Sequence, residues 1–452
     1  MNNPSPQVDV ISASEHGISQ ADISKQALDV LLRLKDAGYD SYLVGGCVRD
    51  LILGYEPKDF DVVTNASPEE VRKLFRNCRL IGRRFRLAHV RYGREIIEVA
   101  TYRAAPQEAD EDADMAHSDS GRILRDNVYG TIEEDAIRRD FACNALYYNA
   151  ADTTVRDYVG GYADVKQGIL RVIGDPDRRY REDPVRMIRA IRFAAKLGLR
   201  IEEKSREPIV RLGYHLQEVP PARMFEEILK LFHSGMAMSV FEMLRHYELF
   251  QYLFPATDHE LDHGTDLSFN QLVTLSLNNT DARINEGKPV TPAFLYAVML
   301  WRPVMLGMAT RLADGMAPQD ALRAAATEAF HEQAGHTSVP KRFSMVTRDI
   351  WVMQKRFELR GGKRAHRLFD HQRFRAAYDF LCLRARAGEI EPGLCEWWTE
   401  FQEVDLAGRE KMIKALGPSQ HKTRRRRRRK PRGDRAEGPS GGNRTGNNPS
   451  YD

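Results

Sequence analysis

Asp59 and Asp61 are two carboxylates separated by a single residue, and apolar Val62 and Val63 follow them. On an extended segment alternate side chains face the same side, so both carboxylates would project together from Cα atoms about 7 Å apart. Such a pair suits two divalent cations that act together on a phosphoryl group. Mg²⁺ fits this chemistry, because it prefers one or two carboxylates completed by substrate phosphates. The structural alternative is an exposed turn in which both aspartates cap backbone groups.

A turn with two glycines, Gly45 and Gly46, lies just upstream, between a short apolar run and an expected helix. Such a turn lets backbone amides approach an anion closely, and the helix N-terminus adds partial positive charge. Arg49 follows in the first helical turn, from which it could reach a phosphate. A tight turn that uses glycine only for its backbone angles is the alternative, and the motif taken alone favours it.

Arg139 and Asp140 belong to a third motif, which ends near Asn144. Asp140 could activate a hydroxyl nucleophile or complete the metal site. Arg139 could donate a pair of hydrogen bonds to a triphosphate, and Asn144 could donate to a sugar or a base. A helix N-terminus with a surface ion pair explains these residues about as well on their own.

A fourth motif begins at Asp183, which precedes Pro184 and is therefore expected to be the N-cap of a helix. Arg186, Arg189 and Arg192 recur every three residues and so share one face of that helix. A carboxylate beside a row of guanidinium groups could recognise a nucleobase edge and bind phosphates. The alternative is an ordinary amphipathic helix whose arginines face solvent.

The elements around these motifs predict an α/β head followed by helices. Short strands and helices alternate up to about residue 101, and helical periodicity begins at Thr131 and persists after about Glu182. An acidic loop is expected over 104–121. The expected strands are 42–44, 59–63 and a hairpin of 88–92 with 95–101; the expected helices are 24–36, 47–53, one that begins with a capping box at Ser67, 183–198, 219–233, 237–249, 290–302, 318–330 and 372–388.

The charge is distributed unevenly along the chain. Its 452 residues, 42% hydrophobic and 29% charged, can form a packed interior but are too many for one ordinary core. Residues 422–452 hold eleven Lys or Arg against three acids, so this segment carries +8 and, because the whole chain is +4, the remainder carries −4. Six consecutive arginines followed by Pro, Gly, Ser and Asn predict a disordered basic tail.

The sequence also excludes several classes of protein. No run reaches the roughly 20 apolar residues of a membrane helix, and the N-terminus lacks the pattern of a secretory signal. The five cysteines lack CxxC or Cys/His spacing, which disfavours a disulfide scaffold and a structural zinc site and fits a reducing cytosol. The expected organisation is an unstructured lead (1–20), an α/β head (21–175), a helical neck (176–240), a helical body (241–415) and the tail (416–452).

In this order and spacing, the four motifs resemble nucleotidyltransferases that act on RNA 3′ ends, in the bacterial class shared by poly(A) polymerases and tRNA CCA-adding enzymes. The resemblance spans roughly residues 40–235. It implies a small mixed sheet with helices, two Mg²⁺ ions on Asp59 and Asp61, and Asp140 as the third active-site acid. Glu98 competes for that third place, although its position on the same side as Ile96 and Ala100 favours a role in the core. The residues implied to bind the nucleotide are Gly45, Gly46, Arg49, Arg139, Asp183, Arg186 and Arg189.

Two features resemble the poly(A) polymerases more than the CCA-adding enzymes. The first is the segment from Leu80 to Val90, with Arg83, Arg84 and Arg86 before a strand, and the second is the arginine-rich tail. The helical body, as in Lys363 to Asp379, also resembles this family, and the resemblance implies that the neck (176–240) binds nucleotide and RNA and that the body (241–415) binds RNA. The residues implied to bind RNA are Arg83 and Arg84 and, in the tail, Arg424, Arg425, Arg426, Arg427, Arg428 and Arg429.

The implied reaction is transfer of AMP from ATP to an RNA 3′-hydroxyl, in RNA polyadenylation and decay. ATP and RNA 3′ ends are the implied partners, RNA-decay proteins are further candidates, and a cytoplasmic monomer is expected. A CCA-adding enzyme is the nearest alternative. An RNA-binding adaptor with an inactive head is disfavoured because every metal and phosphate ligand type is present. A phosphohydrolase of the HD type is disfavoured because the chain has no His-Asp dipeptide.

Overall fold

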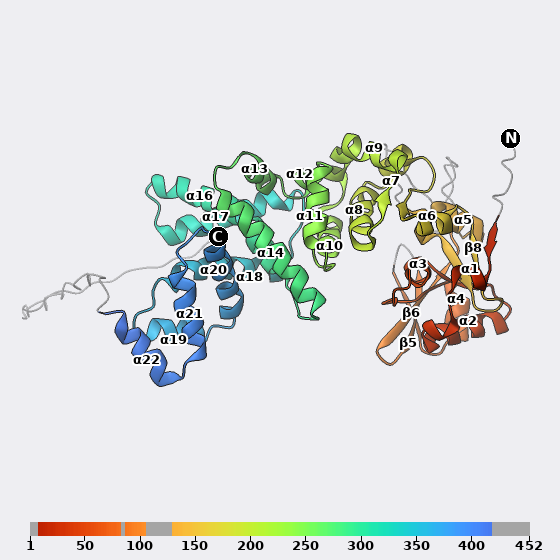
Figure 1. The fold of residues 1–452 in the computed structure, drawn as a ribbon, viewed down its shortest axis with the longest axis horizontal. Helices are drawn as coiled ribbons and strands as arrows, with labels where there is room; N and C mark the ends of the chain where they lie inside the picture. Colours follow the sequence, from red (N-terminus) through yellow and green to blue (C-terminus); the bar gives the residue numbers. More distant parts are fainter. Residues whose placement is uncertain (1–7, 83–85, 105–128, 418–452) are drawn as a thin grey trace, which may run out of the picture.

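A computed structural model describes residues 8–82, 86–104 and 129–417 of the chain. Figure 1 shows an elongated molecule, with a sheet-containing head at one end and helices that lead away from it to the other. The expected fold class, an α/β head with a mixed sheet followed by a helical remainder, is confirmed. Nearly all of the expected acidic loop (104–121) and of the expected tail (416–452) lies outside the described residues.

Eight strands form the sheet of the head, in the order β1-β8-β7-β2-β3-β6-β5-β4. Among these described strands, β3 and β6 form the one parallel pair, and the other neighbours are antiparallel. β2 and β3 are therefore central, and each has neighbours on both sides. The strands are β1 (Asp9–Ile11), β2 (Ser41–Val44), β3 (Asp61–Thr64), β4 (Cys78–Ile81), β5 (Leu87–Tyr92), β6 (Glu95–Thr101), β7 (Leu146–Asn149) and β8 (Thr154–Asp157).

The helices of the head begin where the sequence supplies caps. The Ser24 hydroxyl accepts the backbone amide of Ala27 and starts α2 (Lys25–Asp36), whose apolar stripe is buried against the sheet. α4 (Pro68–Leu74) starts with the expected capping box of Ser67 and Glu70. Both predictions are confirmed, as is the β5–β6 hairpin. The other short elements are α1 (Ala13–His16), η1 (Gln20–Asp22), α3 (Gly46–Ile52), α5 (Ile132–Arg138), η2 (Ala142–Asn144) and α6 (Gly161–Gln167).

Three predictions about the head are wrong. Residues 8–20, the described part of the expected unstructured lead, are structured, because β1 pairs with β8 and Ile11 is buried. The chain after Thr131 is not continuously helical, because β7 and β8 follow α5 and enter the sheet. Strand β3 begins only at Asp61, so Asp59 lies in the connection that precedes it.

The neck and body are helical, apart from a small parallel pair, β9 (Ile169–Leu170) with β10 (Arg200–Ile201). The six helices predicted after residue 182 are confirmed as α8, α10, α11, α15, α17 and α20.

Among the described helices none alone could cross a membrane; α15 and α16 together have sufficient length and apolar character but are bent by 52°. The helices are α7 (Pro176–Glu182), α8 (Val185–Leu197), α9 (Glu203–Leu212), η3 (Gly213–Glu218), α10 (Pro221–Phe232), α11 (Ala237–His246), α12 (Phe250–Leu253), α13 (Pro255–His263), α14 (Leu267–Asn285), α15 (Pro292–Met299), α16 (Trp301–Ala313), α17 (Pro318–Ala334), α18 (Lys341–Phe357), α19 (Lys363–Phe369), α20 (Phe374–Arg386), α21 (Gly393–Glu403) and α22 (Leu406–Ala415).

The apolar interior of the described residues comprises a long core, a separate cluster in the head around Tyr42 and Tyr147, and a smaller core in the last helices. The long core extends from the head through the neck into the body. The smaller core is rich in aromatic residues and holds α19, α20, α21 and α22 together around Phe357, Phe374, Trp398 and Phe401. The last helices therefore form a compact unit at the end of the molecule opposite to the head (Figure 1).

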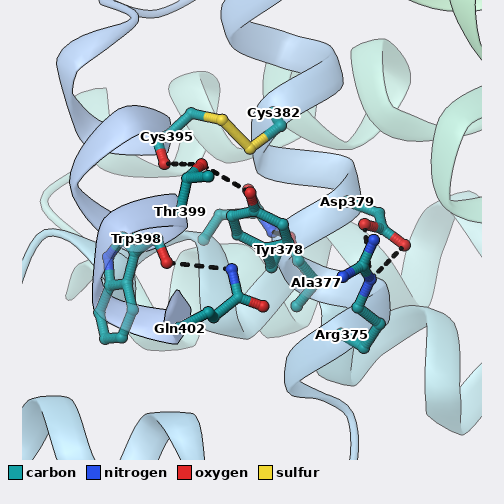
Figure 2. Close-up of a disulfide and its surroundings, with 10 residues drawn as sticks. Arg375, Ala377, Tyr378, Asp379, Cys382, Cys395, Trp398, Thr399 and Gln402 are labelled. Carbon is teal, nitrogen blue, oxygen red and sulfur yellow. Dashed lines mark hydrogen bonds and ion pairs between the residues drawn. A yellow bond between two sulfur atoms is a disulfide. The ribbon is translucent and has the colours of Figure 1, made fainter. Parts of the chain in front are cut away.

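A disulfide between Cys382 of α20 and Cys395 of α21 reinforces this smaller core (Figure 2). Next to it, the hydroxyls of Tyr378 and Thr399 lie 2.6 Å apart and share a hydrogen bond. Cysteine spacing, which disfavours a disulfide scaffold, carries no signal for this single disulfide, because the packing of two helices brings residues 13 positions apart to a Cα–Cα distance of 5.2 Å. The three remaining cysteines, Cys47, Cys78 and Cys143, are free and buried.

Candidate active site

The two-glycine turn and the aspartate pair lie together at the ends of two central strands. β2 and β3 are antiparallel, and their register sets Val44 opposite Asp61. The chain therefore leaves β2 through Gly45 beside the point where it enters β3. Gly45 has φ 81° and ψ −133°, a backbone conformation that residues with a side chain adopt only with strain. This turn thus requires glycine for its shape.

The carboxylates of Asp59 and Asp61 are both exposed, and neither has a hydrogen bond or ion pair to a side chain in the described part of the chain. The pKa of Asp61 is raised to about 6. Its main cause is desolvation by the surrounding protein, although solvent reaches the carboxylate itself; the charges of Glu98 and Asp59 add to it, and Arg139 opposes it. Asp59 and Asp61 thus repel one another and have no ion-pair partner among the described residues, which favours the binding of a cation.

Glu98 lies beside Asp61, because β3 and β6 are parallel and their register pairs these two residues. The Glu98 side chain is 48% exposed, and its carboxylate is 3.4 Å from Nε2 of His89. Ile96, on the same face of β6, is also exposed. The expectation that Glu98 faces the core is therefore wrong. Of the two acids considered for the third place, Glu98 is the one whose charge raises the pKa of Asp61.

Arg139 lies against the two-glycine turn, since a Cβ added to Gly45 would be 3.6 Å from its Nη1. Asp135 accepts hydrogen bonds from Nε and Nη2 of Arg139 at 3.1 and 2.9 Å, and the Tyr147 hydroxyl lies 3.0 Å from Nε. Burial opposes the charge of Arg139, but Tyr147 and Asp135 outweigh burial and raise its pKa above the usual value. Arg139 is thus a fixed positive charge close enough to Asp61 to affect its ionisation.

Asp140 takes part in a polar network that joins the head to the neck. Its Oδ2 accepts hydrogen bonds from Nε and Nη2 of Arg189 on α8, at 2.8 and 2.5 Å. Its Oδ1 accepts from the Asn144 amide at 3.3 Å, and Asn144 in turn accepts from Nη1 of Arg49 at 2.5 Å. Burial raises the pKa of Asp140, but Arg189 and Asn144 outweigh burial and lower it to about 2. Asp140 is therefore a permanently charged anchor for Arg189.

Arg49 is a buried member of this network. Its guanidinium donates to the carboxylate of Asp50 at 2.6 and 2.9 Å, in addition to the bond to Asn144, and its side chain is 4% exposed. The short helix α3 thus directs Arg49 toward η2 and α8, where it lies over the ring of Phe193. This position suits a residue that fixes the two-glycine turn against the neck.

The fourth motif is built differently from its prediction. Pro184, not Asp183, is the N-cap of α8, and Asp183 is the C-cap of α7. Asp183 pairs with Arg223 of α10 at 2.7 Å through Oδ2. Arg186 is buried and donates to Glu182 and to the backbone of α7. The alternative, a helix face whose arginines are solvated, is therefore wrong at Arg186. Arg189 is also paired, because it donates hydrogen bonds to Asp140.

The sequence motifs do not identify two charged residues that hold this region together. Arg179 is buried, pairs with Glu182 at 2.9 Å and donates to the carbonyls of Arg138 and Arg139 at 2.6 Å, so it ties α7 to the end of α5. The i,i+3 spacing of Arg179 and Glu182 is the signal that could have found this pair. Asp135, which holds Arg139, follows the capping residue Thr131 and resembles any acid in a first helical turn.

The residues expected to bind RNA belong to two segments of the chain. Arg83 and Arg84 lie outside the described residues, as do the tail arginines, Arg424, Arg425, Arg426, Arg427, Arg428 and Arg429. Arg86, which the structure describes, forms an exposed ion pair with Glu69.

The donor set fits Mg²⁺ bound together with a substrate. Within the described ranges, no three His, Cys, Asp or Glu side chains are gathered closely enough to hold a metal by themselves. Asp59 and Asp61 supply two exposed carboxylates, and phosphate and water oxygens would have to complete the coordination. This is the mode that Mg²⁺ commonly uses in nucleotide-dependent enzymes.

Comparisons with known proteins agree with this geometry. Residues 41–171 match the family described as the poly A polymerase head domain, residues 198–261 match the probable RNA- and SrmB-binding site of polymerase A, and residues 314–432 match the polymerase A arginine-rich C-terminus. Poly(A) polymerase I of Escherichia coli O6:H1 (strain CFT073) is 50% identical over 439 residues, which cover 96% of this chain and 94% of that protein.

CCA-adding enzymes are more distant. The enzyme of Lactobacillus helveticus (strain DPC 4571) is 36% identical over 223 residues, which cover 49% of this chain and 53% of its own. The solved structure of the Bacillus stearothermophilus CCA-adding enzyme in complex with CTP shares the fold, with a TM-score of 0.57, 22% identity, and coverage of 87% of this chain and 82% of that one. Because the match at 50% identity extends over nearly the whole length of both proteins, the chain belongs to the poly(A) polymerase family.

Proposed function

We propose that this protein transfers AMP from ATP to the 3′-hydroxyl of RNA without a template and releases pyrophosphate. The observation that carries the proposal is the exposed pair Asp59 and Asp61 beside the Gly45–Gly46 turn. This arrangement occurs in a chain whose full-length relative is a poly(A) polymerase.

Asp59 and Asp61 would hold two Mg²⁺ ions. When bound, these ions would lower the pKa of the RNA 3′-hydroxyl and neutralise charge on the β- and γ-phosphates. Glu98, at the adjacent position on β6, is the better-placed candidate for a third acid. Asp140 would act by positioning Arg189, since both hydrogen bonds from that guanidinium go to its Oδ2.

The nucleotide would lie between the two-glycine turn and α8. Gly45 and Gly46 would offer backbone amides to the triphosphate, and Arg139, fixed by Asp135, would donate to its oxygens. Arg49 would hold this turn in place through Asn144.

Adenine selection is assigned to Asp183 with Arg186 and Arg189. The Oδ1 of Asp183 is buried and lacks a hydrogen-bond partner among the described residues. A buried acceptor without a partner costs about 1–3 kcal/mol, which a donor on the nucleobase would offset. Arg186 and Arg189 lie on the same helix face as each other, and bonds to Glu182 and Asp140 hold their guanidinium groups in place.

RNA would bind through the positive charge of Arg83 and Arg84 and of the tail arginines at 424–429, because phosphate contacts dominate the affinity for RNA. We also propose that the protein acts as a cytoplasmic monomer in RNA polyadenylation and decay, alongside RNA-decay proteins. One core that extends from head to body within a single chain supports a monomer.

Incorporation of each of the four nucleotides into an unstructured RNA primer with Mg²⁺ tests this function. Long adenylate tracts are expected with ATP and little extension with the other three. In Asp59→Ala or Asp61→Ala, loss of a metal ligand should lower the rate by roughly a thousandfold, equivalent to about 4 kcal/mol of transition-state stabilisation, with RNA binding largely retained.

Asp36→Ala is the matched control, because Asp36 is an exposed acid at the end of α2, away from the two-glycine turn. It should leave the rate unchanged. A product that stops after CTP and ATP have been added as CCA would assign the protein to the alternative activity. Normal turnover in Asp59→Ala would contradict the two-carboxylate mechanism.

A further inference from the structure

A basic groove lies on the surface of the last helices, which Figure 1 shows at the end of the molecule opposite to the head. It is a hollow of about 860 Å³ between the segment that joins α18 to α19, α19 itself and the end of α22. Its basic residues are Arg360, Lys363, Arg364, Arg367 and Lys414. None of the motifs that define the candidate active site includes this groove.

The five cations of the basic groove lack carboxylate partners within the described residues. One acid, Glu358, also lines the groove, but it pairs with Lys355 at 3.2 Å. Elsewhere in the body, arginines such as Arg245 and Arg302 each bond to two carboxylates. Uncompensated positive charge converging on a hollow attracts an anion with several charges.

The walls of the groove are held in place by aromatic packing. The Arg409 guanidinium of α22 lies over the ring of Phe369 of α19, 4.2 Å from its centroid. Nε1 of Trp398 donates to the carbonyl of Phe357 at the end of α18, at 3.0 Å. Because the helices are fixed, the cations they carry are already gathered before any ligand binds, which lowers the entropy lost on binding.

The backbone at the mouth of the groove is unobstructed. Gly361 and Gly362 form part of its lining, and a Cβ added to either would meet no atom within 4 Å. Gly362 has φ +58°, which favours glycine. A polymer backbone could therefore approach the peptide chain closely at this point.

The basic tail begins where the groove ends. Gly417, the last described residue, lines the groove, and the six arginines start seven residues later at Arg424. Like charges repel, so the tail is unsuited to fill the groove, and both features suit one polyanion that extends from one to the other.

We infer that the basic groove binds the phosphate backbone of the RNA substrate, upstream of its 3′ end. The inference rests on the proposed function only in naming RNA as the polyanion. A concave hollow fits a single strand better than a flat anionic membrane surface. Because the groove and the head are at opposite ends of the molecule, the groove would retain the RNA between successive additions without contacting the reacting nucleotide (Figure 1).

The test combines Lys363→Gln, Arg364→Gln and Arg367→Gln in the full-length chain, the groove variant. Binding of oligoadenylate of about 40 nucleotides is measured by fluorescence anisotropy without ATP, at several salt concentrations. The slope of log K against log salt should fall by about 2, because each contact to a single strand contributes about 0.7, and affinity should fall about tenfold or more. The first AMP addition to a primer of about 6 nucleotides, close to the length that one binding module covers, should keep its kcat and KM.

The control variant removes the same charge outside the groove, through Arg323→Gln, Lys341→Gln and Lys411→Gln, all exposed positions and one of them on α22. If RNA affinity and its salt slope fell equally in the groove and control variants, or did not fall in the groove variant, the inference would be overturned. Loss of binding to anionic vesicles with unchanged RNA binding would also overturn it. Arg364→Lys with Arg367→Lys should retain RNA affinity, which separates lost charge from lost folding. If the unmodified protein adds no AMP, the proposed function fails, while the binding data still test the groove.

Discussion

Asp61 has an acid on either side, and its pKa therefore depends on the charges of both acids. Asp59 precedes it in the chain, and Glu98 is its neighbour across the sheet. Both charges raise the pKa of Asp61, in addition to the larger effect of desolvation. A metal ligand must be deprotonated to bind, so metal affinity depends on this pKa.

Magnesium activation should weaken as the pH falls through about 6, because Asp61 becomes protonated there. Glu98→Gln removes one of the charges that raise this pKa, so the loss of activation should move to lower pH, by less than about one unit. The measurement is the Mg²⁺ concentration for half-maximal AMP incorporation between pH 5 and 8.

Glu95→Gln is the control for this experiment, since it removes an acid from the same strand that does not affect the pKa of Asp61. If the pH at which Mg²⁺ activation is lost moved equally in both variants, the electrostatic coupling of Glu98 to Asp61 would be contradicted. A loss of Mg²⁺ affinity by the same factor at every pH would make Glu98 a direct ligand.

At the residue scale, the sequence predicts the chemical groups better than their partners. The spacing of Asp59 and Asp61 and the two glycines before them suffice to predict that they lie together. The exposure of Glu98 could not be predicted, because alternation along β6 does not say which face is covered. The bond between Asp140 and Arg189 joins residues 49 positions apart, and local spacing carries no signal for such a contact.

At the scale of elements, α6 supports the polar network through a close backbone contact. The Asp157 carboxylate accepts the backbone amides of Val159, Gly160, Gly161 and Tyr162, which fixes the start of α6. A Cβ on Gly161 would be only 2.0 Å from the carbonyl oxygen of Ala142. Ala142 begins η2, the turn that carries Asn144 and so connects Arg49 to Asp140.

Gly161→Ala should therefore displace η2 and lower both stability and AMP incorporation. Overpacking of this kind costs about 1–3 kcal/mol. The measurements are the free energy of unfolding and the incorporation rate well below the melting temperature. Gly393→Ala, at the start of α21, is the control, because a Cβ there meets nothing within 4 Å and should change neither quantity. Equal effects of the two substitutions would contradict the role of α6.

The elements with local signals are the ones that the sequence predicts. α2 and α4 have serine caps and apolar stripes, and the β5–β6 hairpin alternates around Gly93. β1, β7 and β8 were not predicted, because each has only three or four residues. β7 and β8 form a local hairpin, but pairing with distant β2 and β1 completes their place in the sheet. The Cys382–Cys395 disulfide likewise depends on how α20 and α21 pack.

At the scale of the whole molecule, chemistry and retention of the RNA are separated in space. The acids of the candidate active site lie in the head, and the basic groove lies in the last helices (Figure 1). The sequence adds a segment of net charge +8 after the groove. A chain that is −4 outside this segment would repel RNA over much of its surface, so its positive charge is most effective where it is concentrated.

Deletion of residues 422–452 should weaken RNA binding and shorten the tracts made in one encounter, while the rate of a single addition at saturating primer is kept. Loss of eight net charges should lower the salt slope by up to about 6, at about 0.7 for each contact. Deletion of 436–452 alone is the control, because it removes Arg444 together with two acids and so leaves the basic run intact. Because the groove and the tail would contact different phosphates, combining the longer deletion with the groove variant should lower the slope by the sum of the two separate effects. If the combined variant has the same salt slope as the 422–452 deletion alone, the groove holds RNA only through the tail.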